Sequence, residues 1–375
     1  MRAMTTMLSL RALNRATLAR QLLLARAPLT PVEAVHRLFA MQAQLARPPF
    51  IGLWSRLEGF ERDALTRAVH ARELVRATHL RATLHLMTAA DFQATRATIQ
   101  PVLDAGFQSI LKTIQKQRGA GIPDLGPLVE AARLAFEAQP RPFEPMRQAL
   151  LEQFPAADDR AMGYAVRTQL PLVQVPTEAE WGWPGTADFA TAESWLGAPI
   201  ATTSDVPGLV RRYLAAFGPA TPKDMQIWSG LPAAGLKPVF EAMRGELVTF
   251  KDPRGRELFD LPDAPRPDED TPAPVRFMPD FDNLVLSHDD RTRVGTDDHR
   301  ARIYAKGNLR VFPFFLVDGF VAGVWKVEKK QGVATLTVSP FEAIARGNRE
   351  AIADEGERLA RFCEPAAKAY AVTFE

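Results

Sequence analysis

Cysteine is almost missing from this 375-residue sequence, in which Cys363 is the only one. A single cysteine excludes an internal disulfide and a cysteine-cluster metal site, so we expect a reducing compartment. Long apolar runs are missing too: no stretch of about 18 apolar residues occurs, and no membrane-spanning helix is predicted. The arginine-rich N-terminus lacks the apolar core and cleavage site of a signal peptide. A cytoplasmic protein is the resulting expectation.

Familiar catalytic signatures are missing as well. The stretch GAGIPDLG lacks the Lys-Ser/Thr of a P-loop, and neither a G-x-S-x-G elbow nor a histidine pair at i, i+4 occurs. His79 and His85 lie six residues apart on an expected hairpin, whereas His288 and His299 are far away in sequence. Because no ligand spacing is present, we expect no metal and no organic cofactor.

The charge is uneven along the chain. Residues 1–120 carry 17 Lys+Arg against 7 Asp+Glu, although the whole chain has a net charge of only +2. Arginine supplies 15 of those 17 cations, and arginine suits phosphate recognition. The asymmetry indicates a surface that meets nucleic acid, or alternatively only a solvated basic face.

The clearest local pattern lies between residues 219 and 261. Thr221-Pro222 predicts a helix start, and a short helix then ends near Ser229-Gly230. A second helix follows through Met243, and two strands flank the turn DPRGR at 252–256. Helix, tight turn, helix and hairpin form the winged-helix arrangement.

The same order occurs twice more. Helices near 9–25, 30–44 and 61–71 precede the strands ELVRAT and ATLHLMT, which flank a turn near Leu80. In the middle, helices near 126–138, 143–153 and 158–169 precede a strand pair in LPLVQVPTEAEWGW. Patterning alone therefore predicts three winged-helix units in tandem.

The C-terminal part changes character. Residues 252–274 are rich in proline and acid and are typical of a linker. Alternating strands follow, with hairpin turns at Asp318-Gly319 and at 330–332, and a helix near 347–364 closes the chain. The fold class we predict is mainly α with small β: three winged helices plus a C-terminal antiparallel β-barrel and a closing helix.

The predicted domain boundaries follow from these units. Winged helices occupy 1–95, 96–195 and 196–265, the β-barrel 275–345, and the C-terminal helix and tail 346–375.

Several long segments resemble the AlkZ/YcaQ family of winged-helix DNA glycosylases, over about residues 8 to 366. They are LARQLLLAR, MQAQLARPPFIGLWSRL, RATLHLMTAADF, FMPDFDNLVLSHDDRTRV and LVDGFVAGVWKV. The family removes N7-alkylated guanines, including those in interstrand crosslinks. Its catalytic signature is glutamine, an apolar residue and then glutamine, or an acid in the YcaQ branch. It falls here on Gln42-Ala43-Gln44 and resembles the AlkZ branch.

Glutamine suits such a reaction although it is neither a useful acid nor a useful base. Guanine alkylated at N7 carries a positive charge and leaves without a general acid. Two amide oxygens can then place a water molecule and stabilise an oxocarbenium-like sugar. We therefore expect activity to be confined to cationic lesions.

The spacing of the two glutamines raises a geometric question. Residues two apart point in different directions on a helix but to one side of an extended segment. Arg47 precedes Pro48 and is biased away from the α region, so the preceding helix should fray after Met41. Gln42 and Gln44 would then project together into a cleft. The alternative is a pair of ordinary solvated glutamines.

Other residues are candidates for DNA contact, each with a structural alternative such as a surface arginine, a hydrogen bond or a salt bridge to Asp289 or Asp290. They are Arg47, Arg56, Arg81, Thr83, His85, Arg291 and Arg293. Phe50 and Trp54 can stack near an opened base pair, but core packing is the more common role of aromatics at this spacing. Trp181 and Trp183 are predicted to pack between strands.

The sequence thus predicts a monofunctional DNA glycosylase that uses water as its nucleophile. Lysines are few before residue 240 and none lies near Gln42, so no Schiff base and no strand cleavage are expected. The expected partner is double-stranded DNA carrying alkylated guanine, bound by a monomer in the nucleoid. Two alternatives stay open: a non-catalytic DNA-binding regulator, and a protein that sequesters adducts for self-resistance. The identity of the alkyl lesion is open too.

Overall fold

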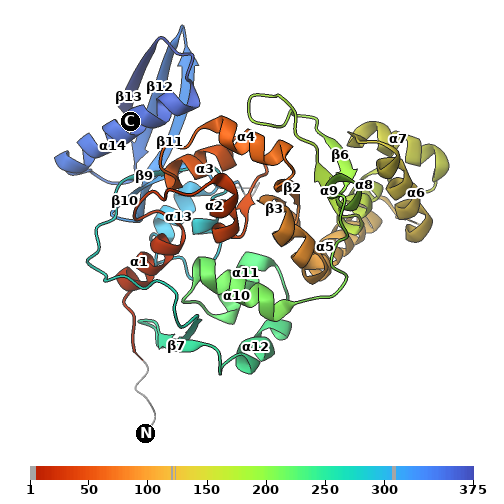
Figure 1. The fold of residues 1–375 in the computed structure, drawn as a ribbon, viewed down its shortest axis with the longest axis horizontal. Coiled ribbons are helices and arrows are strands. Elements are labelled where there is room, and N and C mark those ends of the chain that lie inside the picture. The colour runs from red at the N-terminus through yellow and green to blue at the C-terminus, as the bar shows by residue number, and fades with distance from the viewer. Residues whose placement is uncertain (1–5, 120, 123, 306–309) are drawn as a thin grey trace.

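A computed structural model describes residues 6–119, 121–122, 124–305 and 310–375 of the protein (Figure 1). The first part of the chain contains α1 (Leu10–Arg20), α2 (Pro31–Leu38), β1 (Met41–Gln42), α3 (Pro48–Arg56), α4 (Arg62–His70), β2 (Leu74–Thr78), the 3-10 turn η1 (Leu80–Ala82) and β3 (Leu84–Thr88). The expected hairpin is confirmed, because β2 and β3 pair antiparallel around η1.

Helix α2 begins where the sequence predicts and ends earlier. Thr30 and Glu33 form a reciprocal capping box with proline in the first turn. The helix stops at Leu38, where Phe39 takes a positive φ of 67° and is fully buried. The chain therefore leaves the helix before the glutamines instead of fraying after Met41.

The expectation for Arg47 was wrong. Its φ of −67° and ψ of −42° are helical, and its carbonyl accepts from the amides of Phe50 and Ile51. Those hydrogen bonds start α3, a helix over the double proline that the sequence analysis missed. Helix initiation thus outweighs the bias that a following proline imposes.

The second part contains α5 (Ala89–Arg118), α6 (Leu125–Ala138), β4 (Arg141–Pro142), α7 (Phe143–Gln153), α8 (Asp159–Gln169), β5 (Leu172–Gln174), β6 (Asp188–Thr191) and α9 (Ala192–Leu196). Its strands join the first hairpin in one six-stranded sheet of order β1-β3-β2-β5-β6-β4. The junction is β2–β5, where Arg76 is paired with Gln174 and Ala77 with Val173.

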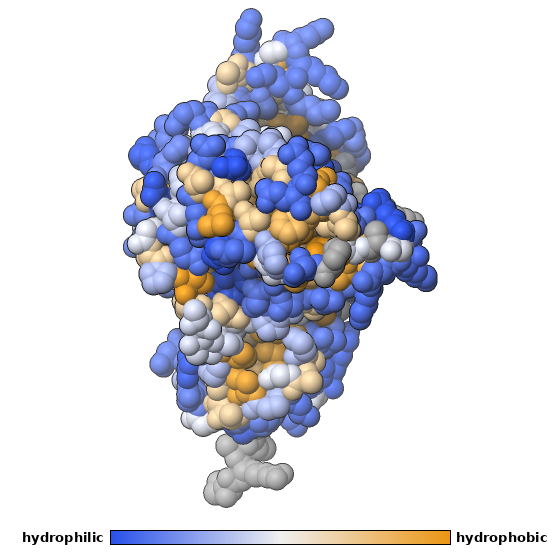
Figure 2. Space-filling model, turned by 90° about the vertical axis from the view of Figure 1, so that its right-hand side faces the viewer, coloured by the Kyte–Doolittle hydropathy of each residue, from blue (hydrophilic) through white to orange (hydrophobic). Residues whose placement is uncertain are grey.

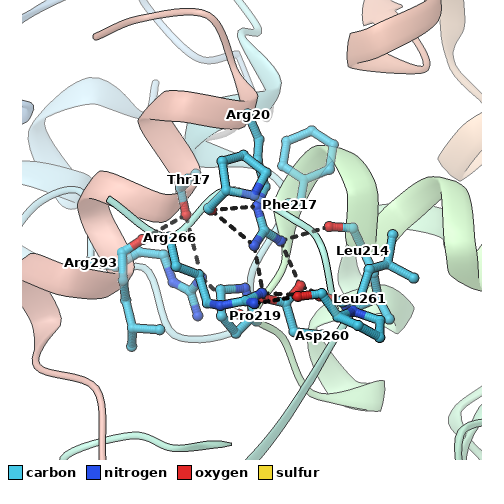
Figure 3. Close-up of polar contacts among 12 residues, drawn as sticks. Thr17, Arg20, Leu214, Phe217, Pro219, Asp260, Leu261, Arg266 and Arg293 are labelled. Carbon is cyan, nitrogen blue, oxygen red and sulfur yellow. Dashed lines mark hydrogen bonds and ion pairs between the residues drawn. The ribbon is translucent and has the colours of Figure 1, made fainter. Parts of the chain in front are cut away.

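The third part contains α10 (Val206–Phe217), α11 (Pro222–Ser229), α12 (Ala233–Ala242), β7 (Val248–Lys251) and β8 (Glu257–Asp260). The predicted start at Thr221 is confirmed by a capping box with Asp224, and Gly230 ends α11 with a φ of 84°. Figure 3 shows how α1 is fastened to this part: Arg20 donates to both carboxylate oxygens of Asp260, at 2.8 Å each, and to the carbonyl of Leu214.

The C-terminal part contains β9 (Arg276–Met278), the 3-10 turn η2 (Asn283–Val285), α13 (Asp297–Ile303), β10 (Phe314–Val317), β11 (Phe320–Lys330), β12 (Val333–Pro340), α14 (Arg346–Cys363) and β13 (Ala369–Phe374). Both predicted hairpin turns are confirmed, with positive φ at Asp318 and Gly319 and at Gln331 and Gly332.

The predicted closed β-barrel was wrong. The strands form a five-stranded sheet of order β13-β12-β11-β10-β9, whose end strands do not pair with each other within the described residues. The tail is a strand, β13, that adds parallel to β12. Helix α14 covers the apolar face through Ile352, Leu359 and Cys363, so this face is buried without closure of the sheet.

Figure 2 looks at the side of the molecule that carries α6, α7 and α8 and shows a mostly hydrophilic face on which apolar side chains gather in several small patches. None of the helices that the structure describes is long and apolar enough to cross a membrane.

Candidate active site

The segment Gln42-Ala43-Gln44 forms an edge of the six-stranded sheet. Gln42 is paired with His85 of β3, and the amide of Ala43 donates to the carbonyl of Leu84 at 2.8 Å. From β2, Arg76 donates through Nε to the carbonyl of Ala43 at 2.8 Å and through Nη2 to that of Gln44 at 3.2 Å. The segment is therefore extended and is held both by β3 and by the side chain of Arg76.

Gln44 is exposed and lines a large cleft. Its Oε1 accepts a hydrogen bond of 2.8 Å from the amide of Leu84. The cleft has a volume of about 800 Å³ and lies between the first hairpin and the helices α5 and α8. Its lining residues are Gln44, Thr78, Arg81, Ala82, Leu84, Gly106, Ser109, Ile110, Tyr164, Arg167, Thr168, Gln174 and Phe189.

Gln42 lies behind this cleft. It is only 9% exposed and lines a cavity of about 10 Å³, shared with Asp282 and Asn283, that can hold roughly one water molecule. Its Oε1 accepts from Nη2 of Arg81 at 2.8 Å. The structure therefore does not bring both glutamines into one cleft; Arg81, which lines the cleft and binds Gln42, connects them.

Arg81 occupies the turn between β2 and β3 in a left-handed conformation, with a φ of 54°. Nη2 also donates to Oδ1 of Asn283 at 3.0 Å, and Nη1 donates to the carbonyl of Trp228. Burial lowers the pKa of Arg81 to about 10, so the guanidinium stays charged at neutral pH. This one side chain thus links the glutamine segment to α11 and η2.

His85 is buried beside Arg81. Nδ1 lies 3.0 Å from the carbonyl of Thr83, and Nε2 lies 3.4 Å from Nη2 of Arg81. This arrangement fits a neutral ring that donates from Nδ1 and accepts at Nε2. Burial, and next the charge of Arg81, lowers the pKa of His85 well below 6.5. The histidine is therefore no general acid at neutral pH.

The cleft has no carboxylate among its described lining residues. The described residues also contain no group of three or more His, Cys, Asp or Glu side chains that could hold a metal ion. The site can thus orient water and present amide dipoles and the positive charges of Arg81 and Arg167, and its described lining offers no carboxylic acid for a leaving group.

The other DNA-contact candidates divide by burial. Arg56 is 1% exposed and forms two hydrogen bonds of 3.0 Å to Asp282, so its expected phosphate contact gives way to an internal ion pair. Arg293 is buried as well and donates to the carbonyl of Pro219 (Figure 3). The described contacts contain no salt bridge between Arg293 and Asp290. Asp290 instead pairs with Arg254 and Arg256.

Three candidates keep some exposure. Arg47 stacks over Trp181, with its guanidinium carbon 5.4 Å from the ring centroid. Its Nε and Nη2 are buried without a hydrogen-bond partner among the described residues. Arg291 donates to the carbonyl of His288, and Thr83 donates to that of Leu80.

The aromatic residues near the glutamines are packing residues, the more common role. Phe50 is fully buried and meets Trp181 edge to face at 5.3 Å, and Trp54 stacks on Phe362. Trp183 is buried too, whereas Trp181 is only partly buried.

Sequence reasoning missed three residues that build the site. Arg76 fixes the glutamine segment, Asn283 holds Arg81, and Gln174 lines the cleft. Asn283 stands as an isolated amide in the apolar stretch DNLVL, which is a signal that could have found it. Arg76 and Gln174 carry no such signal, because the role of Arg76 depends on the strand order β1-β3-β2 and that of Gln174 on the β2–β5 pairing.

Comparisons with known proteins agree on one family. The family model for "DNA glycosylase AlkZ-like" matches residues 35–362. The "Interstrand DNA cross-link repair glycosylase" of Streptomyces sahachiroi is 28% identical over 162 residues, which span 41% of this chain and 42% of that protein. The solved structure of Streptomyces sahachiroi DNA glycosylase AlkZ covers 99% of this chain and 100% of its own, with 20% identity and a TM-score of 0.78. The last likeness shows that the fold is shared.

Proposed function

Since the chain belongs to the AlkZ-like DNA glycosylase family, we propose that it hydrolyses the N-glycosidic bond of cationic N7-alkylated deoxyguanosine in double-stranded DNA. The observation that carries this substrate class is the cleft beside Gln44, which contains no carboxylate among its described residues. A neutral base needs a proton to depart, whereas a cationic guanine does not. A site that contains amides, hydroxyls and two arginines but no carboxylic acid therefore suits a base that departs without a proton.

Gln44 and Gln42 are the catalytic residues of the proposal. Each amide oxygen already accepts one hydrogen bond from a fixed donor, and its second lone pair can face water or the sugar. Gln44 reaches the cleft and would place the attacking water. Gln42 would place its dipole near the positive charge that develops on the sugar. Arg81 binds Gln42 and lines the cleft, so the sugar of the bound DNA must lie close to this arginine for Gln42 to act on it.

The fold supports DNA as the partner. We interpret the three helix–hairpin parts as winged helices, which bring helices and wings to a duplex. They differ from one another and suit one asymmetric lesion, so we expect a monomer acting on the nucleoid. Arg47 and Arg291 are the remaining phosphate-contact candidates. Because a relative is named for crosslink repair, we include interstrand crosslinks among the proposed substrates.

The test uses a duplex with one N7-methyl-deoxyguanosine, incubated with protein and then with mild alkali to cut abasic sites. We expect scission above spontaneous depurination, reduced ~10²- to 10³-fold in Gln44→Ala and Gln42→Ala. The matched control is Gln153→Ala, since Gln153 is an exposed glutamine on α7 outside the cleft.

Other outcomes separate the alternatives. Tight binding without release from either a monoadduct or a crosslink would support a sequestering protein or a regulator instead. Equal loss of release in the Gln153 control would show that the glutamine variants act through stability. Release from a uracil-containing duplex would contradict the restriction to cationic bases.

A further inference from the structure

We propose that Gln174 reads the Watson–Crick edge of the damaged base, with its Oε1 accepting from N1–H of the guanine in the cleft. This inference rests on the proposed function and adds a specificity residue to it.

The first observation is an unsatisfied oxygen. Oε1 of Gln174 is buried and has no hydrogen-bond partner among the residues that the structure describes. Nearly all buried polar atoms in folded proteins have partners, because leaving one unpaired is costly. Such an atom at a cleft is typical of a group kept for a ligand.

The second observation is the direction of the side chain. Arg76, Gln174 and Phe189 are aligned across β2, β5 and β6, so their side chains share one face of the sheet. Thr78 and Leu84 lie on this face too, two residues from Arg76 and its partner Leu86. Thr78, Leu84, Gln174 and Phe189 all line the cleft. The register therefore turns Gln174 toward the space that Gln44 borders.

The third observation concerns the residues that line the cleft together with Gln174. Phe189 and Tyr164 also line the cleft, and aromatic rings of this kind stack on bases. The volume of about 800 Å³ is within the usual range for sites that enclose an organic ligand, and it leaves room for an alkyl group beside the base. A base in this cleft would thus have Gln44 toward its sugar and an amide at its edge.

The chemistry of the lesion selects the donor. Guanine presents N1–H and its amino group at the Watson–Crick edge, whereas adenine has an acceptor at N1. Alkylation at N7 makes the base cationic, and a cationic donor forms a stronger hydrogen bond to an amide oxygen. The same positive charge that makes the base leave thus strengthens its recognition by Gln174.

The experiment compares Gln174→Met with wild-type protein on N7-methyl-deoxyguanosine and N7-methyl-deoxyinosine duplexes, with Gln153→Met as control. Inosine keeps N1–H and lacks the amino group. We expect kcat/KM for Gln174→Met to fall ~10- to 100-fold on both substrates. Its affinity for undamaged duplex should not change. Its Tm should equal or exceed that of wild type, because the oxygen has no partner to lose.

Three results would overturn the inference. Wild-type rates in Gln174→Met, with Gln44→Ala inactive, would remove Gln174 from the site and leave the proposed function standing. A loss confined to the guanine substrate would move the contact to the amino group. A lower Tm with unchanged activity per folded molecule would make Gln174 a structural residue. If wild-type protein releases neither base, the proposed function itself has failed.

Discussion

The ion pair of Arg56 and Asp282 allows a quantitative test of what a buried arginine does in a DNA-binding protein. The side chains are 2% and 3% exposed and are joined by two hydrogen bonds of 3.0 Å. Arg56→Met leaves the Asp282 carboxylate buried without its partner, and breaking such a pair costs ~3–5 kcal/mol. For a chain of this length, a loss of about 4 kcal/mol lowers Tm by roughly 5 °C.

The second variant distinguishes structure from DNA contact. In Arg56→Met/Asp282→Asn both charges are gone, and the asparagine keeps an oxygen in place of Oδ1, which accepts from the amide of Leu284. Replacing both partners is nearly neutral, so Tm should recover most of the loss. The control is Arg346→Met, since the Arg346 side chain is 93% exposed and a surface pair contributes little.

DNA binding by the double variant completes the test. We expect wild-type affinity and an unchanged dependence of log K on log[salt], measured by fluorescence anisotropy well below Tm. If Arg56 contacted a phosphate, the slope would fall by ~0.9 while stability was restored. That result, or a single variant as stable as wild type, would refute the internal role of Arg56.

Further predictions concern pH, Arg81 and metal. Burial lowers the pKa of His79 to about 3 and that of His85 well below 6.5, so below pH 6.5 the unfolded chain binds more protons than the folded chain. The free energy of unfolding, measured by denaturant titration, should therefore fall from pH 7.5 to pH 5, by about 2 kcal/mol for His79 alone. The ratio of the wild-type release rate to that of Gln44→Ala should be flat from about pH 6 to 9, since titration of the substrate affects both proteins alike and Arg81 stays charged; a bell-shaped ratio would indicate an acid or base that we have not identified. Arg81→Lys cannot hold Gln42, Asn283 and the Trp228 carbonyl together, so kcat should fall ~10²-fold with little change in KM; a rise in KM alone would make Arg81 a phosphate contact. A chelator should leave the rate unchanged, and loss of activity restored by a divalent cation would contradict a metal-free site.

The sequence predicted what local chemistry controls. Thr30 and Thr221 start their helices as expected, and the hairpin turns at Asp318 and Gln331 adopt the positive φ that their sequences favour. It mispredicted what depends on distant partners. The bias on Arg47 lost to the first hydrogen bonds of α3, and alternation in the C-terminal strands does not show whether a sheet closes or is covered by a helix.

The candidate site shows the same contrast between features set by the local sequence and features set by distant residues. The Gln42-Ala43-Gln44 segment was found through a resemblance, and its extended conformation agreed with the spacing of the two glutamines. The network around it was not predictable, because Asn283 lies 202 residues from Arg81 in the chain. The hydrogen bond from Arg81 to the buried Gln42, which Gln44 does not share, is likewise a tertiary effect.

The pairing of β2 with β5 has a mechanical consequence. Because one sheet runs under both walls of the cleft, the walls cannot swing apart or close without breaking strand hydrogen bonds. The cleft is thus rigid, so the bending and unstacking needed to bind a lesion must occur in the duplex. Lesions that already weaken their own base pair require the least free energy of DNA deformation to enter such a cleft. The flexibility of the damaged DNA would therefore contribute to selectivity before the base itself is contacted.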